Sequence, residues 1–398
     1  MECDVIVVGA GPAGLAASIT AAEKGMKTVL LEKSTEIGYP VKTSALTWAE
    51  VMNSWNIPKV VMSQWYTSFF ISSSYSQREV EINFKRKVCG VLNYHAFLQE
   101  LAFRAAQKGV YIFLAERAIE PLIKNEKVIG VKTDKKSINS KVVIDASGPS
   151  AIIGKKAGII PEYKNLELGV GIEYEMTNVL LRNQHSFDFY VGKETVPIGY
   201  AWVFPVGKDR ARVGIDTVYN TPENIEEENI RYWHNKFLSE SSPIYSYVKK
   251  AQPYETHGGA YPLCGIVEKP YTDGLILAGD SAAQASMLVG EGIRYALEFG
   301  KYAAEIASKA IRLNDYTENT LRDYCEKCSN YLGETFLVAA DLLKVPTDEY
   351  WEAVLDSIIR AKKEKQEELC LKYLKTAFSY DDARNFFPQF INKYLPSH

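Results

Sequence analysis

The sequence predicts a mixed α/β fold, α+β overall, and three observations carry this prediction. Residues 1–32 read as an apolar strand, a glycine loop, a helix of small residues and a second apolar strand. Residues 166–216 show the alternation of polar and apolar residues that is typical of antiparallel strands. From about residue 292 onward, apolar residues recur with helical spacing. We therefore expect a parallel sheet with its helices, a second, antiparallel sheet and a helical C-terminal region.

The glycine loop after the first strand has the pattern G-x-G-x-x-G, formed by Gly9, Gly11 and Gly14. The first glycine permits a sharp turn, the second lets the backbone approach a pyrophosphate, and the third lets the helix pack closely on the strand. Pro12 and Ala13 begin the helix, whose free N–H groups and positive dipole end favour a bound phosphate. This arrangement predicts a Rossmann-like dinucleotide-binding unit.

An acidic residue completes this unit. Glu32 ends the second strand, about twenty residues after the loop, where a carboxylate can accept hydrogen bonds from ribose hydroxyls. Lys33 follows it and is a further candidate cofactor ligand. Because the loop follows a strand, opens a helix and is followed by an acid, a glycine turn without a ligand is the weaker interpretation. We expect an enzyme that uses a dinucleotide cofactor.

Two later apolar strands run into turns of small residues. One passes through residues 142–144 toward Gly148, and the other passes through residues 274–277 into Gly279 and Asp280. Open α/β sheets bind their ligands at the carboxyl ends of parallel strands. We therefore expect these turns to join the cofactor site, and the strands of the first sheet to be discontinuous in the sequence.

Periodicity predicts the remaining elements. Helices are expected over residues 45–53, 95–108 and 222–250, and short strands over residues 64–84 and 110–144. His257 precedes two glycines, where a histidine in a turn is the favoured interpretation and a proton donor at the cofactor is the alternative. Cys325 and Cys328 lie in a helical stretch without a second pair of ligands, so we expect them to pack in a helix and predict no metal site.

The bulk composition limits the class of protein. The chain has 398 residues, 46% of them hydrophobic and 24% charged, which is ordinary for a globular protein. The net charge of −3 gives no reason to expect nucleic acid as a partner. Six scattered cysteines favour a reducing, cytoplasmic location. No apolar run is long enough to span a membrane.

Three blocks in this order resemble the FAD-dependent oxidoreductases of the p-hydroxybenzoate hydroxylase fold. The blocks are the N-terminal unit, the turn at residues 145–150, and Gly279-Asp280 with the turn that contains Gly290 and Gly292. The resemblance implies that FAD is the cofactor and that Asp280 binds the ribityl hydroxyls. It also implies that Gly290, Gly292 and Ile293 supply backbone near the pyrimidine end of the flavin. A helix N-terminus there would stabilise negative charge on a reduced flavin.

A fourth block is similar to the Y-x-W-x-F-P signature of geranylgeranyl reductases, which use reduced FAD to saturate isoprenoid double bonds. Tyr200, Trp202 and Phe204 alternate along a predicted strand and so share one face. That face either lines a pocket for an apolar chain or forms an aromatic core stripe. The resemblance implies an isoprenoid lipid or another apolar small molecule as substrate, lipid biosynthesis as the setting, and NAD(P)H or ferredoxin as electron donor.

The candidate catalytic residues are Thr43, Ser44, Tyr200 and Trp202. Reduction of an alkene needs an acid as well as a hydride, and an ordinary hydroxyl such as that of Thr43 or Ser44 is too weak an acid to act alone. A flavin-bound water or the Tyr200 hydroxyl is an alternative proton donor.

The sequence departs from the reductase pattern at three places. Residues 41–45 lack the usual Cys-Gly pair, Tyr94 stands where an arginine is usual, and Met287 stands where a proline is usual. These differences indicate a divergent, archaeal-type member. A flavin monooxygenase or halogenase on the same scaffold is an alternative function, and a non-catalytic flavin- or lipid-binding protein is another.

Three domains are predicted. The FAD-binding domain takes residues 1–60, 85–165 and 271–315, the β-rich substrate domain takes residues 61–84 and 166–270, and the helical C-terminal domain takes residues 316–398. The aromatic stretch 378–394 is a candidate for peripheral membrane contact. Packing of this stretch against the core of the protein is the favoured interpretation, because it has no clear basic face.

Overall fold

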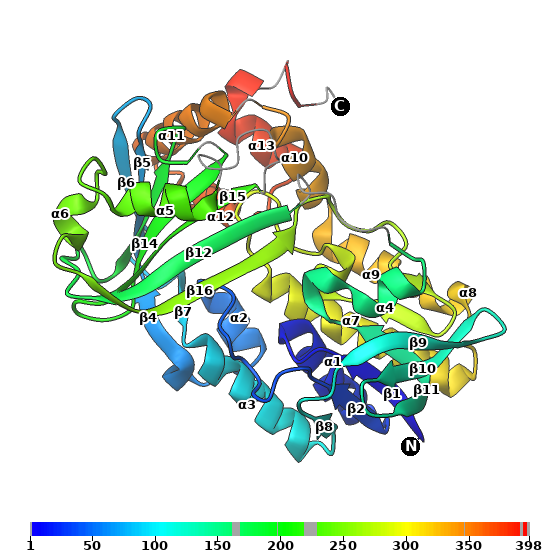
Figure 1. Cartoon of the computed structure of the whole chain (residues 1–398). Coiled ribbons are helices and arrows are strands. Elements are labelled where there is room, and N and C mark those ends of the chain that lie inside the picture. The colour runs from blue at the N-terminus through cyan, green and yellow to red at the C-terminus, as the bar shows by residue number, and fades with distance from the viewer. Residues whose placement is uncertain are drawn as a thin grey trace.

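A parallel sheet assembled from three separate segments of the chain forms one side of the molecule (Figure 1). The computed structural model describes residues 2–160, 168–196, 198–218, 229–345, 347–390 and 393–395. The sheet has the order β17-β18-β11-β1-β2-β8, in which the edge strand β17 is antiparallel to β18 and the other neighbours are parallel. Strands β9 and β10 continue from β11 as an antiparallel meander. Its strands are β1 (Glu2–Val8), β2 (Thr28–Leu31), β8 (Tyr111–Phe113), β9 (Ala118–Lys124), β10 (Lys127–Thr133), β11 (Ser137–Asp145), β17 (Tyr271–Thr272) and β18 (Leu275–Leu277).

Small residues bring the helices of this side into close contact. Helix α1 (Pro12–Glu23) packs on α3 (Tyr94–Gln107) and on α7 (Ile293–Leu313). A Cβ atom at Gly300 of α7 would lie 2.1 Å from the Ala13 carbonyl oxygen, and one at Gly14 would lie 1.8 Å from the Gly9 carbonyl oxygen. Only glycine permits these approaches, which fix the start of α1 against β1 and against α7.

A second sheet lies over the first and has the order β16-β12-β15-β14-β13-β5-β6. Its strands are antiparallel to their neighbours except for β13 and β5, which pair in parallel. Helices α5 (Ile230–Leu238) and α6 (Tyr245–Val248) adjoin one of its faces. The strands are β5 (Ser68–Ser73), β6 (Glu79–Asn83), β12 (Leu168–Thr177), β13 (Ser186–Val191), β14 (Gly199–Pro205), β15 (Ala211–Val218) and β16 (Gln252–Pro262).

Two helix predictions need correction. The helix expected over residues 45–53 begins only at Ala49, because Leu46–Trp48 (β3) pairs with Cys89–Leu92 (β7). Helix α2 then spans Ala49–Ser54, and β4 (Met62–Tyr66) completes this three-stranded sheet. The helix expected over residues 222–250 is two short helices, α5 and α6, and residues 219–228 lie outside the described part of the chain. The three-stranded sheet takes strands from two of the predicted domains, whose boundaries stay a prediction.

The C-terminal region is helical and has its own aromatic core. Its helices are α8 (Glu318–Leu321), α9 (Asp323–Leu332), α10 (Thr335–Leu342), α11 (Thr347–Lys363), α12 (Glu367–Leu374) and α13 (Tyr380–Phe386). Phe378, Phe386, Phe387 and Phe390 are buried, as the packing interpretation of this stretch predicts. Cys325 and Cys328 lie in α9, half-buried and buried. Within the described residues, no helix is long and apolar enough to cross a membrane.

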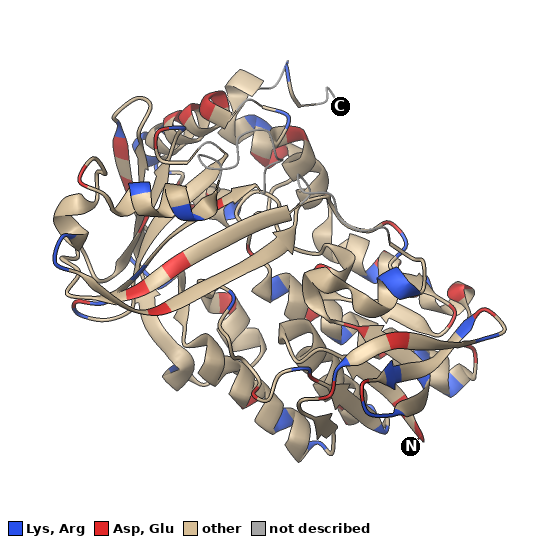
Figure 2. Cartoon of the chain, viewed as in Figure 1, with Lys and Arg blue, Asp and Glu red and all other residues tan. Residues whose placement is uncertain are grey.

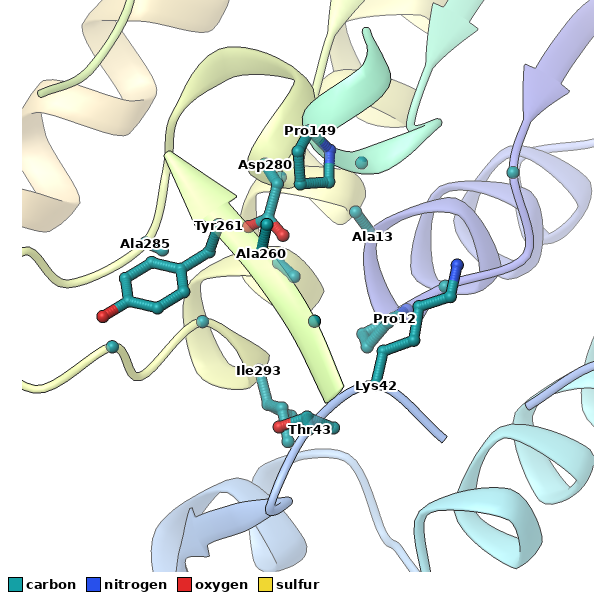
Figure 3. A pocket seen from close by; sticks show the side chains of 18 of the residues that line it. Pro12, Ala13, Lys42, Thr43, Pro149, Ala260, Tyr261, Asp280, Ala285 and Ile293 are labelled. Carbon is teal, nitrogen blue, oxygen red and sulfur yellow. The ribbon is translucent and has the colours of Figure 1, made fainter. Parts of the chain in front are cut away.

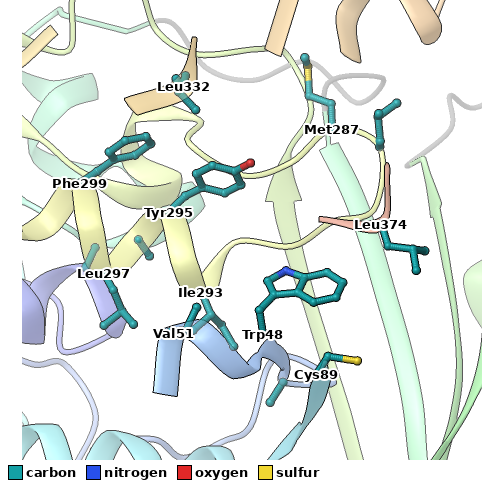
Figure 4. Packing of buried hydrophobic residues seen from close by; sticks show 14 of the residues in the cluster. Trp48, Val51, Cys89, Met287, Ile293, Tyr295, Leu297, Phe299, Leu332 and Leu374 are labelled. Atoms are coloured by element: carbon teal, nitrogen blue, oxygen red, sulfur yellow. The ribbon is translucent and has the colours of Figure 1, made fainter. Parts of the chain in front are cut away.

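The start of α7 is held between the N-terminal side and the C-terminal helices. Figure 4 shows Ile293 and Tyr295 of α7 among Trp48, Val51 and Leu374. All five side chains belong to the largest hydrophobic cluster and are less than 10% exposed. This packing sets the position of the helix N-terminus, which borders the cavity described next.

Candidate active site

A cavity of about 660 Å³ lies between the two large sheets. Sixteen of the seventeen candidate site residues line it, and Gly14 does not, because it packs the helix on the strand. The lining members are Gly9, Gly11, Pro12, Ala13, Glu32, Lys33, Thr43, Ser44, Gly148, Tyr200, Trp202, Gly279, Asp280, Gly290, Gly292 and Ile293. The fold therefore brings together residues that are almost three hundred positions apart in the chain.

One end of the cavity has the features of a phosphate site. A Cβ atom added at Gly11 or Gly148 would meet no atom within 4 Å, so both glycines leave open space on the cavity side. Gly11 is the N-cap of α1, and no side chain caps the helix. The free N–H groups of α1 and its positive dipole end are thus available to an anionic ligand.

Glu32 follows β2 directly and lines the cavity beside the glycine loop. Its two carboxylate oxygens accept hydrogen bonds from the backbone N–H groups of Ala10 (2.9 Å) and Ser34 (2.8 Å). Burial lowers the pKa of the neighbouring Lys33, and the charge of Lys42 acts in the same direction. Lys33, Lys42, Arg117 and Lys156 all line this end, so the cavity is electropositive where the glycine loop lies.

Asp280 lies where the second candidate acid was expected. It belongs to the short helix η4 (Gly279–Ala282), and Figure 3 shows its side chain at one side of the pocket, near Pro149 and Ala260, with Thr43 and Ile293 at the opposite side. Burial raises the pKa of Asp280 to about 6. Among the described residues, no side-chain or backbone donor satisfies its carboxylate. A half-buried carboxylate that lines the cavity without a donor fits a ligand that brings hydroxyl groups.

The turn before α7 closes the middle of the cavity. Gly290 has a φ of +60°, and a Cβ atom there would lie 3.0 Å from the Tyr261 ring. Glu291 accepts a hydrogen bond from the backbone N–H of Arg294 (2.9 Å), and burial raises the pKa of this carboxyl although Arg294 opposes the shift. The N-terminus of a 21-residue helix therefore points its dipole at this turn.

The face of the second sheet toward the cavity has two halves. The aromatic half consists of Phe187, Phe189, Tyr200, Trp202 and Phe204 on β13 and β14. Their rings contact one another, as between Tyr200 and Trp202 (5.8 Å between centroids) and between Trp202 and Phe204 (5.7 Å). The Tyr200 hydroxyl donates to the Val289 carbonyl oxygen at 2.8 Å, which ties the strand to the turn before α7.

The polar half consists of Glu173, Glu175, Arg212, Asp216 and His257 on β12, β15 and β16. Glu173, Asp216 and His257 line the cavity, and Glu175 and Arg212 lie beyond its edge on the same strands. Figure 2 shows the acidic residues of β12, which are Glu173 and Glu175. Glu173 accepts hydrogen bonds from Trp202 Nε1 (2.8 Å) and His257 Nδ1 (2.7 Å), and Arg212 Nε donates to Glu175 at 2.9 Å. Each of these buried charges has a partner, which is the condition under which burial of charge is tolerated.

His257 corrects one prediction. It lies in the middle of β16, not in a turn, and only 2% of it is exposed. The two glycines after it continue the strand and pair with β12. Gly259 passes close to the Lys42 carbonyl oxygen, where a Cβ atom would not fit. Burial lowers the pKa of His257, but the hydrogen bond and charge of Glu173 outweigh it and raise the pKa.

The polar half also positions the loop with the candidate hydroxyl residues. Arg212 Nη1 donates to the carbonyl oxygens of Ser44 (2.7 Å) and Leu92 (3.2 Å). Thr43 Oγ1 accepts from the backbone N–H of Ala45 at 3.0 Å. Arg212 therefore joins the loop to β15, and the loop stays at the cavity wall.

Sequence reasoning singled out His257 but missed the carboxylates and the arginine of the polar half. Its members lie far apart in the chain, and no motif joins them. A usable signal was present, because Glu173, Glu175, Arg212 and Asp216 occupy alternating positions of apolar strands, where a charge is costly unless it has a partner or a task.

Comparison with known proteins agrees with this geometry. Residues 4–231 match the family described as FAD dependent oxidoreductase. The chain is 35% identical over 377 residues to the digeranylgeranylglycerophospholipid reductase of Methanocaldococcus jannaschii, with 93% of each chain covered. It is 32% identical to digeranylgeranylglycerophospholipid reductase 2 of Methanopyrus kandleri, with 87% of each chain covered.

Solved structures show the same architecture. A geranylgeranyl bacteriochlorophyll reductase-like protein from Thermoplasma acidophilum superposes with a TM-score of 0.80 at 28% identity, and the match covers 89% of this chain and 90% of the other. A flavin-dependent brominase superposes with a TM-score of 0.76 over 99% of both chains, but at 18% identity. The second likeness shows a shared fold alone.

Proposed function

Because the chain belongs to the FAD-dependent oxidoreductases and, within them, to the digeranylgeranylglycerophospholipid reductase family, we propose that it saturates double bonds of isoprenoid chains in lipids. The cofactor is FAD. One observation carries the substrate proposal. A single cavity joins the glycine loop, where a dinucleotide fits, to the aromatic half of the second sheet, where an apolar chain fits.

The residues at the glycine-loop end have binding tasks in this proposal. Reduced FAD, when bound, supplies the hydride equivalent for the reduction. Gly11 and the N-terminus of α1 accommodate the pyrophosphate, Glu32 accepts hydrogen bonds from the ribose hydroxyls, and Asp280 accepts them from the ribityl hydroxyls. The lysines and Arg117 at this end add positive charge near the phosphates.

The residues at the other end orient the lipid chain. Tyr200, Trp202 and Phe204 offer ring faces to an apolar chain and exclude water. The Tyr200 hydroxyl already donates to Val289, and burial raises the pKa of Tyr200 well above its usual range. Tyr200 is therefore a positioning residue in this proposal and a poor proton donor.

The electron donor and the membrane contact are further parts of the proposal. Only one dinucleotide loop occurs in the sequence, so NAD(P)H would visit the flavin without a Rossmann domain of its own, or ferredoxin would deliver the electrons. An isoprenoid lipid resides in the bilayer, which leads us to infer a peripheral contact on the cytoplasmic side. Because the aromatic rings near residue 386 are buried in the C-terminal core, we do not assign that contact to them.

The test is reduction of a defined lipid by the purified holoenzyme. The protein is reduced with dithionite without oxygen and mixed with a phospholipid that carries geranylgeranyl chains. We expect reoxidation of the flavin that depends on the lipid, and a mass gain of one dihydrogen for each double bond reduced. The matched control is the same lipid with saturated chains, which should leave the flavin reduced.

Two outcomes would contradict the proposal. One is a flavin that stays reduced with both lipids, and the other is an oxygenated or halogenated product when air and halide are admitted. The second outcome would instead assign the protein a monooxygenase or halogenase activity, as in the flavin-dependent brominase that shares its fold.

A further inference from the structure

The side chain of Asp216 is a buried acid in the cavity wall that the proposed function does not yet use. It lies on β15, opposite Tyr200 of β14 and Gly171 of β12. Its Oδ1 accepts a hydrogen bond from the Tyr261 hydroxyl at 2.9 Å. A Cβ atom at Gly171 would lie 3.5 Å from Oδ2, so the missing side chain leaves space beside this oxygen. Within the described residues, Oδ2 has no hydrogen-bond partner.

We propose that Asp216 is the acid that protonates the isoprenoid double bond, an inference that rests on the proposed function. One alkene carbon gains the hydride equivalent that the reduced cofactor supplies, and the other gains the proton of Asp216. The π bond breaks and two C–H bonds form, so the alkene is reduced while the cofactor is oxidised. Asp216 becomes a carboxylate, which the Tyr261 hydroxyl stabilises, and water returns the proton.

The position of Asp216 fits this role. It borders the aromatic half through its strand partner Tyr200, and it borders the turn before α7 through Tyr261, whose ring covers Gly290. The acid therefore lies between the wall assigned to the lipid chain and the turn assigned to the flavin. Both Asp216 and Tyr261 line the cavity.

Its surroundings support a proton on Asp216 near neutral pH. Burial raises the pKa of Asp216 to about 7, although the hydrogen bond from Tyr261 lowers it. An acid with a pKa near the working pH combines a populated acid form with a useful driving force for proton transfer. The titratable and charged groups on the elements around it are Tyr200 of β14, Glu173 and Glu175 of β12, Arg212 of β15, Tyr261 and His257 of β16, and Asp280 of η4.

The other polar groups of the cavity wall are less suited to donate the proton. Glu173 accepts two hydrogen bonds and pairs with His257. His257 Nδ1 donates to Glu173, while Nε2 lies 3.2 Å from a Glu255 oxygen without forming a hydrogen bond within the described residues. The Thr43 hydroxyl has the pKa of an alcohol and is too weak an acid. Asp216 is thus the carboxyl group whose free oxygen meets open space in the substrate end of the cavity.

The experiment compares four holoenzymes, the natural protein and the variants D216N, Y261F and D188N. Asp188 is the matched control, because it is also buried, burial also raises its pKa to about 6, and it lies on β13 away from the cavity lining. Each protein is reduced without oxygen and mixed with the geranylgeranyl phospholipid, and the single-turnover reoxidation rate is followed against pH. Bound FAD is measured for each variant by its absorbance.

The expected result has three parts. In the natural protein the rate falls as the pH rises above about 7, because the acid form is lost. D216N reacts about 100- to 10,000-fold more slowly, and its rate no longer falls above about pH 7, so this descending limb of the pH profile is lost. Its FAD content is unchanged. In Y261F the limb moves to higher pH, because the hydrogen bond that lowers the pKa of Asp216 is removed. D188N keeps the natural rate and profile.

A second readout does not depend on turnover. Infrared difference spectra of the oxidised, lipid-free protein should show a carboxyl band that titrates near pH 7 and is missing from D216N. An active natural enzyme together with a D216N variant of equal rate and pH profile would overturn this proposal and leave the proposed function intact. A natural enzyme that leaves every double bond intact would overturn both.

Discussion

The aromatic half and the polar half of the cavity wall share one face of one sheet, yet their stability has opposite origins. The rings of the aromatic half are stabilised by burial of apolar surface and by ring contacts. The charges of the polar half lose water on burial, and pairing compensates for this loss. Trp202 belongs to both halves, since its ring packs against Phe204 while its Nε1 donates to Glu173.

The two halves therefore respond differently to substitution. An aromatic wall accommodates an apolar chain and tolerates small changes of shape. A paired polar wall is intolerant of the loss of a single partner, because an unpaired charge stays behind. The polar half is therefore the part that can hold a loop or a proton in one defined place.

The largest effect is expected from the loss of a charge in the polar half. Arg212→Met should lower the free energy of unfolding by about 3–5 kcal/mol, because the buried Glu175 would lose its guanidinium partner and keep only the hydrogen bond from the Tyr254 hydroxyl. The same change frees the Ser44 carbonyl oxygen, so binding of lipid should also weaken. Urea denaturation measures the first effect.

Lys132→Met is the control for this change, since Lys132 forms an exposed ion pair with Glu120. A loss of about 1 kcal/mol or less is expected there. Equal losses in the two variants would mean that pairing does not distinguish the polar half from the surface.

The next effect concerns the pH dependence of stability. The folded protein keeps a proton on Asp216 up to about pH 7, whereas an unfolded aspartate releases it near its ordinary pKa of about 3.9. The folded state therefore binds more protons between these values, and the contribution of Asp216 to stability is lost as the pH rises through that window. At about 1.4 kcal/mol for each pKa unit, the total is on the order of a few kcal/mol.

Thermal unfolding of the natural protein and of D216N across this pH range checks this expectation. The difference in stability between D216N and the natural protein should grow with rising pH, in favour of D216N. A difference that is constant with pH would mean that Asp216 is ionised in the fold and belongs with the paired charges.

A smaller effect is expected where the two halves meet. Trp202→Phe keeps an aromatic ring but removes the donor to Glu173, which should cost about 1–3 kcal/mol of unfolding free energy. The affinity for the lipid chain should change little, because the ring face remains. A binding loss as large as that of Trp202→Ala would instead assign Trp202 a direct polar contact with the substrate.

The smallest effect is expected within the aromatic half. Tyr200→Phe removes only the hydrogen bond to the Val289 carbonyl oxygen, and should cost about 0.5–1.5 kcal/mol. Because the expected proton donor lies elsewhere, the pH profile of the reaction should stay unchanged. Loss of the descending limb in Tyr200→Phe would identify the Tyr200 hydroxyl as the acid.

Sequence reasoning found the parts of the site that are written as contiguous patterns. The glycine loop, Glu32, Gly279-Asp280 and the strand of Tyr200 and Trp202 are each readable within a short window. The cavity brings them together as expected, and their chemical roles remain proposals. The strand at Leu46–Trp48 was taken for helix because its partner strand lies some forty residues away, and local periodicity does not report such pairing.

The carboxylates and the arginine of the polar half were missed for a related reason. Glu173 and His257 meet only because β12 and β16 pair over their whole length, and Arg212 reaches Glu175 across the pairing of β12 with β15. No short stretch of the sequence contains both members of a pair. The charges of the predicted strands are therefore visible in the sequence, but the contacts that stabilise them on burial are not.

The glycines of β12, β15 and β16 limit where the cavity can be narrowed by substitution. A Cβ atom at Gly169 would meet the Tyr261 ring at 2.4 Å, one at Gly214 would meet Glu173 at 2.5 Å, and one at Gly259 would meet the Lys42 carbonyl oxygen at 2.3 Å. At Gly171 the nearest atom is 3.5 Å away. Of these four positions, Gly171 alone is adjustable, so a single added methyl group there offers a route to a narrower chain selectivity without rebuilding the sheet.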